Sequence, residues 1–385
     1  MTDRTAAAAA NGRQRPPRHA AETLFFPAAA LYAALAVPLS VHGMLSGQPV
    51  LPGFAGVAGH AHELLFGFSL AVVAGFLINK VSAYRLSALF SLWLIARAAY
   101  LIHPGSLSAL IANAGLAVML LWLAVPQFVR GAKKWRNKAI APILLALAGA
   151  LILFHLPRLM DAPWLRFVAL EQGVVVLALL MLFMGGRIIA PAVAGAIERA
   201  GGRLEARVQP RLEAALLIVM AALFLALAVP GGRPVAGLMA AIASGLALAR
   251  LLRWRLWAAP RRPDLWCLGI GMGWLVVGLA LLAIAWITNR LPVSATTHAI
   301  TVGALGTLTT GVMARVRLNR IKHNPAQSRI IPLMTGLIAV AAILRLTAPT
   351  DVYGLVAASA CWAGAYVLLL WLIIKTNRTQ RQPAA

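Results

Sequence analysis

The sequence predicts an all-α polytopic membrane protein with twelve transmembrane helices and both termini on the cytoplasmic side. Hydrophobic residues make up 61% of the 385 residues and charged residues 12%, with a mean hydropathy of +0.82. Soluble domains carry roughly 45–50% apolar and about 25% charged residues. Twelve apolar runs are each long enough for a bilayer span of about 20 residues. Little chain remains for a sizeable soluble domain on either side of the membrane.

The apolar runs set the expected order of elements along the chain. We expect spans at residues 24–45, 59–79, 85–103, 107–129, 139–157, 167–190, 211–230, 233–252, 264–288, 294–314, 330–348 and 351–374. They form one transmembrane domain over residues 22–376. Residues 1–21 are polar and rich in Ala, Arg and Pro, so we expect a disordered, basic cytoplasmic tail there. Residues 377–385 form a second cytoplasmic tail, and residues 192–210 a solvated linker.

The basic residues alternate between loops, which predicts the orientation. The tails and every second loop hold 29 of the 35 Lys and Arg residues. The other loops hold only Arg158, Arg166, Arg233 and Arg290. Basic loops stay in the cytoplasm, so both termini are predicted inside and the number of spans is even. The net charge of +25 is therefore explained by topology, and nucleic acid is not an expected partner.

Histidines gather at the predicted outer ends of the spans. Six of the eight lie there: His42, His60, His62, His103, His155 and His298. This grouping indicates a shared site near the outer face. The alternative is that neutral His stands where Lys and Arg are disfavoured.

Four charged residues fall in the outer parts of spans. They are Glu63, Arg97, Glu171 and Arg345. A charge inside a membrane is costly and is a candidate for function. These residues are expected either to pair with one another or to meet the acidic groups of a ligand.

The spacing of the histidines separates two roles. His60 and His62 are about 200° apart around a regular helix, so they are expected to serve different partners. Glycines follow both His62 and His298 by 5 and 13 residues, which suits helices that pack closely and present an imidazole to a cavity. Two facing histidines suit a six-coordinate haem, and the remaining outer histidines could hold copper.

Several segments resemble the NnrS family. They are His60–Phe68, Ala74–Leu77, Phe154–Leu156, Gly186–Ile189, His298–Gly306 and Met313–Val316. The resemblance implies a twelve-helix inner-membrane protein of bacteria that contains haem and copper and is associated with nitric oxide and nitrosative stress. Members often carry a Gly-His-Thr-Gly run after the last of these segments. Here Leu318, Asn319 and Arg320 stand in that region.

The layout is also distantly similar to the haem–copper oxidases. By helix number and depth, His62 and His298 match histidines that hold a low-spin haem on helices 2 and 10, and Arg345 resembles an arginine that meets haem propionates. The oxidase copper triad on helices 6 and 7 has no counterpart, so no oxidase-type binuclear centre is expected and a catalysed reaction is not assigned.

These resemblances and the residue pattern give one hypothesis for the site. His62 and His298 are the expected axial ligands of haem b, with Arg345 and Arg97 at its propionates. Glu63 and Glu171 are expected to orient a ligand or carry protons, and His60 and His155 to bind copper. The expected partners are the lipid bilayer, haem, and nitric oxide or its iron adducts.

Two alternatives remain open at this point. Twelve spans with both termini inside is also a common layout for a transporter, here of a metal, haem or a small anion. An accessory protein to a nitric oxide reductase would need no catalytic residues.

Overall fold

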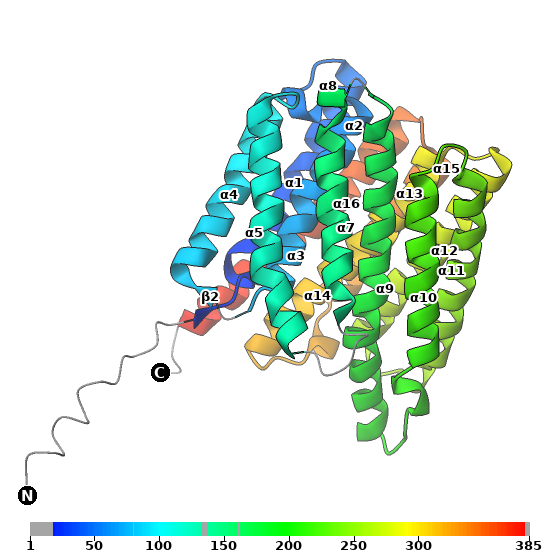
Figure 1. Cartoon of the computed structure of the whole chain (residues 1–385). Coiled ribbons are helices and arrows are strands. Elements are labelled where there is room, and N and C mark those ends of the chain that lie inside the picture. The colour runs from blue at the N-terminus through cyan, green and yellow to red at the C-terminus, as the bar shows by residue number, and fades with distance from the viewer. Residues whose placement is uncertain (1–17, 80, 132–137, 161, 382–385) are drawn as a thin grey trace, which may run out of the picture.

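The protein is a bundle of long helices that run roughly parallel or antiparallel to one another (Figure 1). The computed structural model describes residues 18–79, 81–131, 138–160 and 162–381. Within them, eleven helices are long and apolar enough to cross a membrane. A twelfth apolar helix, Ile140–His155, is shorter, with 16 residues. The prediction of an all-α polytopic protein is confirmed, and eleven of the twelve apolar helices are long enough to cross a membrane.

The helices follow the predicted order. The first half contains α1 (Glu22–Ser46), α2 (Gly56–His62), α3 (Ser69–Leu77), α4 (Ala83–Ile102), α5 (Leu107–Gly131), α7 (Ile140–His155), α8 (Pro157–Met160) and α9 (Leu165–Arg199). The second half contains α10 (Pro210–Leu227), α11 (Arg233–Arg253), α12 (Pro263–Thr288), α13 (Val293–His298), α14 (Leu305–Arg320), α15 (Ile330–Thr347) and α16 (Val352–Arg381). Among the described residues the one sheet pairs β1 (Arg18–His19) with β2 (Val81–Ser82). Residues 1–17 of the predicted tail lie outside the described residues.

One predicted boundary is wrong by several residues. The linker expected over residues 192–210 is helical at its start, because α9 continues past Pro191 to Arg199. Val193, Ala194 and Ile197 are buried and share one face of this extension. Burial of that apolar face stabilises the extra helical turns. The polar residues nearby made this segment look like a loop in the sequence.

Two spans contain a π-helical segment immediately after a histidine. Glu63–Phe68 joins α2 to α3, and Ala299–Ala304 joins α13 to α14. His62 and His298 are the last residues of the α-helices that precede them. Such wide turns are rare and occur often at functional sites. They also change the direction in which later side chains point.

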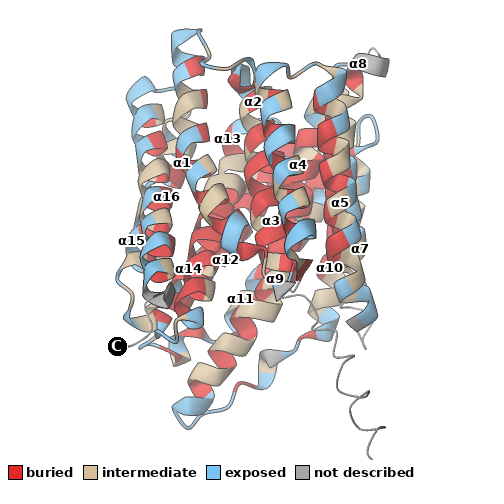
Figure 2. Ribbon diagram, turned by 90° about the vertical axis from the view of Figure 1, so that its left-hand side faces the viewer, coloured by how far each residue is buried: buried red, intermediate tan, exposed pale blue. Residues whose placement is uncertain are grey.

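The outer surface of the bundle is apolar. Large hydrophobic side chains such as Leu31, Ile95, Ile111 and Leu145 are exposed. Figure 2 shows exposed residues on the outer faces of the helices and buried residues along their inner faces. A soluble protein rarely exposes so much apolar area, whereas a bilayer solvates it. The α2–α3, α9 and α13–α14 spans are the most buried, and they form the centre of the bundle.

Both ends of the helical domain lie at the same end of the bundle. Arg317, near the end of α14, donates to Asn377 of α16, and its Nη1 lies 3.6 Å from the Glu22 carboxylate at the start of α1. Arg320 adds a second contact to Glu22, at 2.6 Å. This arrangement agrees with an even number of crossings.

Candidate functional site

His60 and His62 leave α2 towards different neighbours, as their spacing predicted. His60 lines a cavity together with His298. His62 is fully buried on another side of α2, where it contacts His155. The structure therefore contains two histidine pairs, and each pair has one member from α2.

The first pair faces a cavity of about 280 Å³ near the end of the bundle opposite Glu22. The cavity is bounded by α1, α2, α13, α15 and α16. Its apolar wall includes Val37, Val41, Leu64, Val302, Leu305, Ala341, Leu355 and Trp362. His60, His298 and Arg345 supply its titratable groups. The cavity thus combines a mostly apolar wall with two imidazoles and one guanidinium.

The hydrogen bonds of this pair leave imidazole nitrogens available. His298 Nδ1 lies 2.6 Å from the Ser294 carbonyl oxygen, to which it donates. Its Nε2 therefore carries the lone pair. His60 Nδ1 is buried without a hydrogen-bond partner among the described residues. Arg345 Nη1 donates to the Pro349 carbonyl at 3.0 Å. Arg345 lines the same cavity and places a positive charge beside it.

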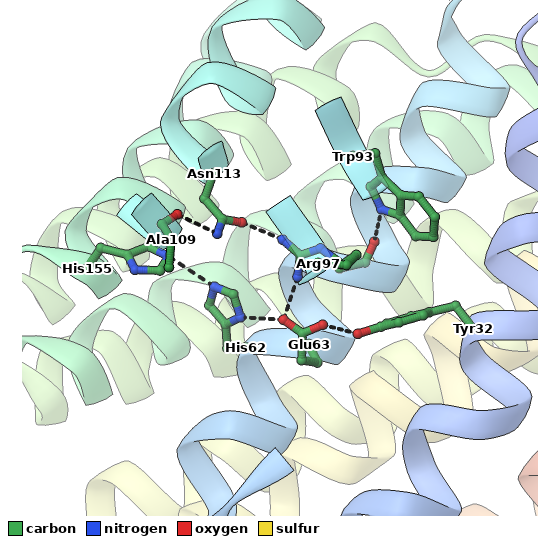
Figure 3. Close-up of polar contacts among 9 residues, drawn as sticks. Tyr32, His62, Glu63, Trp93, Arg97, Ala109, Asn113 and His155 are labelled. Atoms are coloured by element: carbon green, nitrogen blue, oxygen red, sulfur yellow. Dashed lines mark hydrogen bonds and ion pairs between the residues drawn. The ribbon is translucent and has the colours of Figure 1, made fainter. Parts of the chain in front are cut away.

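The second pair belongs to a buried polar network (Figure 3). His62 Nδ1 lies 2.8 Å from Glu63 Oε1, and His62 Nε2 lies 3.2 Å from His155 Nε2. The His62 ring stacks on Tyr100, with centroids 3.6 Å apart. Phe154 packs against the same ring at 4.6 Å. These rings fix the orientation of the His62 imidazole.

Glu63 accepts hydrogen bonds from three elements. Arg97 Nη1 of α4 donates to its Oε1 at 2.5 Å, Tyr32 of α1 donates to its other oxygen, and His62 is the third donor. The other Arg97 amine donates to Asn113 of α5. The hydrogen bonds to Tyr32 and Asn113 offset part of the cost of removing these charges from water, while Arg97 Nε has no partner among the described residues. Of the two alternatives for Arg97, a carboxylate of the protein or the acidic groups of a ligand, the structure shows the pair with Glu63.

Gly67 makes room for this ion pair. A Cβ at Gly67 would lie 2.9 Å from Arg97 Nη1 and 3.1 Å from Glu63 Oε2. Its carbonyl accepts from Trp93 Nε1 at 2.9 Å. Gly67, which was predicted to be a position of close helix packing, therefore leaves room for the Arg97 side chain of α4.

Other candidate residues lie away from both pairs. Glu171 is bound by Arg233 at 2.7 Å, not by Arg97 or Arg345. The expectation that Glu171 pairs with Arg97 or Arg345 is therefore wrong. Arg233, which was assigned to a loop, begins α11 and reaches the Glu171 carboxylate. The side chains of His42 and His103 are exposed. His62 contacts His155, and His298 lines a cavity together with His60.

Three residues of the buried polar network around Glu63 and His62 were not predicted from the sequence. Tyr32 and Tyr100 resemble ordinary aromatic residues of apolar spans. Asn113 carried a detectable signal, since an amide within an otherwise apolar span requires a partner.

Among the described residues, no group of three or more His, Cys, Asp or Glu side chains is placed to hold a metal ion.

A comparison with protein families identifies this architecture. The sequence profile described as NnrS protein matches residues 23–381, nearly the whole chain. The chain belongs to the NnrS family. A comparison with curated proteins gives no match. In this NnrS-family protein, the matched region includes both histidine pairs, the buried Glu63–Arg97 ion pair and all twelve apolar helices.

Proposed function

We propose that this NnrS-family protein binds haem b in the cavity between α2 and α13, where His60 and His298 would hold the iron. The observation that carries the proposal is the pair of imidazoles, from two separate spans, on one mostly apolar cavity. Imidazole is a common axial ligand of haem iron.

The residues around the cavity fit this group. The donated Nδ1–H of His298 fixes its tautomer and directs the Nε2 lone pair away from Ser294, as is usual for metal-bound histidine. The unpartnered Nδ1 of His60 is a polar atom that a bound ligand would help to explain. The volume of about 280 Å³ lies just below the roughly 300–1,000 Å³ typical of ligand pockets, so the cavity must widen to admit a macrocycle. We expect the exposed lining residues Met44 and Leu45 to move outward when the macrocycle enters.

Arg345 completes the proposed haem site. A guanidinium pairs well with carboxylates, and Arg345 lies on the same cavity as the two histidines. We assign it to a haem propionate. Arg97 is not part of this site, because Glu63 and Asn113 occupy its guanidinium. Glu171 is likewise left out, since it pairs with Arg233.

We assign the protein a role in the response to nitric oxide. Family membership supports this assignment. Bound haem supplies an iron centre for one-electron chemistry and for diatomic ligands. The protein residues hold the macrocycle, fix the His298 tautomer and exclude water with an apolar wall. The family resemblance also implies copper, and His62 and His155, whose Nε2 atoms lie 3.2 Å apart, would supply two imidazole nitrogens to it.

The proposed location is the bacterial inner membrane, with both termini in the cytoplasm and the histidine cavity near the periplasmic face. The basic loops support this orientation. A C-terminal fluorescent-protein fusion is expected to fluoresce, and a C-terminal alkaline phosphatase fusion to be inactive. The opposite pair of results would reverse the orientation.

The haem assignment is tested by the absorption spectrum of the purified full-length protein. The wild type is expected to show a Soret band, and His60→Ala and His298→Ala to lose most of it. His62→Ala is expected to keep it, which distinguishes this pairing from that of His62 with His298. His103→Ala, an exposed histidine, is the matched control. A colourless wild type, or a full Soret band in both His60→Ala and His298→Ala, would overturn the assignment and favour a transporter or an accessory protein.

A further inference from the structure

We propose that an apolar hollow between α3, α9 and α14 binds a small uncharged gas molecule and supplies it to the cavity of His60 and His298. The hollow has a volume of about 100 Å³, and Phe26 of α1 completes its wall. Neither histidine pair lines it. The choice of nitric oxide as the gas rests on the proposed function, whereas the site itself rests on the geometry of the hollow.

The hollow begins where the two π-helical segments end. Ser69 is the first residue of α3 after the segment Glu63–Phe68, and Leu305 is the first residue of α14 after Ala299–Ala304. Both residues line the hollow. A π turn is wider than an α turn, so it changes the direction in which the following side chains point. We attribute the gap between α3 and α14 to this change.

The polar atoms in the wall are already hydrogen-bonded. Among the described lining residues, Ser69 and Thr309 are the polar ones and none is charged. Ser69 Oγ donates to the Leu64 carbonyl at 2.9 Å, and Thr309 Oγ1 donates to the Leu305 carbonyl at 2.7 Å. Thr309 Oγ1 also accepts from Tyr366 Oη at 2.7 Å. A buried water needs several polar partners, so the hollow favours an occupant that makes no hydrogen bonds.

Three methionines give the hollow a polarisable wall. Met181 and Met184 of α9 and Met313 of α14 line it. A thioether is soft and polarisable, and the unbranched methionine side chain adapts to an irregular gap. Such a wall holds a small neutral molecule through dispersion. An apolar cavity of roughly 150 Å³ can hold xenon or benzene, so this smaller hollow suits a molecule of diatomic size.

The hollow is open on one side and meets the histidine cavity on another. Val72 and Phe76 of α3 and Ile188 of α9 are partly exposed lining residues. Because all three are apolar, an opening between these helices admits neutral molecules and disfavours ions. Leu305 lines both the hollow and the cavity of His60 and His298. Movement of this one side chain would connect the two spaces, which is the basis of the supply role.

Xenon tests the site because it is neutral, enters apolar cavities and does not react with haem. The full-length protein is labelled with ¹³C at the methionine ε-methyl groups and observed by nuclear magnetic resonance. The methyl signals of Met181, Met184 and Met313 are expected to shift with xenon pressure. The signal of Met334, a fully buried methionine outside the hollow, should stay in place. Absence of a shift at all three lining methionines would overturn the site.

A filled hollow should lose the gas. Val312→Phe places a ring in the hollow, so the xenon shifts should disappear while the Met334 signal keeps its wild-type position. Val340→Phe makes the same exchange at an exposed position of α15 and is the matched control. Xenon shifts of wild-type size in Val312→Phe would overturn the site.

The supply role is tested by rapid mixing of the reduced protein with nitric oxide, followed at the Soret band. Val312→Phe should slow the spectral change severalfold relative to Val340→Phe. Equal rates in the two variants would refute the supply role. The failures of the two proposals are distinguishable. A colourless protein that still binds xenon would overturn the haem assignment and retain the gas site, whereas a Soret band without xenon shifts would do the reverse.

Discussion

Arg97 Nη1 lies 2.5 Å from Glu63 Oε1, and the two side chains have relative exposures of 4% and 0%. The pair joins α4 to the π-helical segment that follows His62. The two opposite charges neutralise each other inside the protein, where both side chains are almost completely shielded from solvent. The pair also connects the stability of the bundle to the orientation of His62, since the same carboxylate accepts from both residues.

Removal of this carboxylate should destabilise the protein strongly. Glu63→Gln leaves Arg97 as a buried cation without its counter-ion, at a cost of about 3–5 kcal/mol in the free energy of unfolding. Denaturation in detergent micelles measures the loss. Glu198→Gln, at an exposed position of α9, should change stability by less than about 0.5 kcal/mol. Similar losses in the two variants would show that the ion pair is not buried as described.

A second buried cluster lies at the end of α14. Asp264 accepts from Arg262 at 2.9 and 2.8 Å, and also contacts Arg315. Asp264→Asn removes the charge that balances both arginines, so we expect a loss of about 3–5 kcal/mol. Asp351→Asn keeps an acceptor for the Gly354 amide and serves as the control. Thermal unfolding in detergent checks the difference, and equal melting temperatures would contradict it.

Close packing at Gly278 supports the helix that carries His298. A Cβ there would lie 2.4 Å from Ile300 Cγ1 and 3.1 Å from the Ile300 amide nitrogen. Gly278→Ala should push α12 away from the π segment at a cost of about 1–3 kcal/mol. Gly273→Ala on the same helix meets nothing within 4 Å and should be neutral or stabilising. Denaturation of both variants tests this, and equal stabilities would refute the packing argument.

Arg345→Gln should weaken haem binding without abolishing it. The substitution removes one charged partner of a propionate and leaves both imidazoles in place. A charged hydrogen bond contributes about 1.5–3 kcal/mol, so haem affinity should fall roughly ten- to a hundredfold. Haem titration monitored at the Soret band measures the affinity. Arg290→Gln should match the wild type, and an unchanged affinity in Arg345→Gln would remove the propionate assignment.

The bundle was predictable because a bilayer requires long apolar helices, and each of the twelve runs corresponds to one. The Arg97–Glu63 pair was also predictable, since a charge inside a span needs a partner. The partners of His60 and His62 could not be predicted in this way. The segment Glu63–Phe68 is π-helical, so the angle of 100° per residue fails between His62 and the glycines that follow it. The partner of each histidine then depends on the positions of α7 and α13, which sequence spacing does not give.

The end of α7 has a consequence for how solvent reaches the protein. Leu156 keeps helical φ and ψ angles after His155 and leads directly into α8, so the helical run continues past the imidazole. His155 also lines a hollow of about 250 Å³ together with Ser106 and Arg166. A hollow of this size with polar groups in its wall can hold water. We therefore expect the His155 imidazole to be hydrated from the side of the loop between α4 and α5.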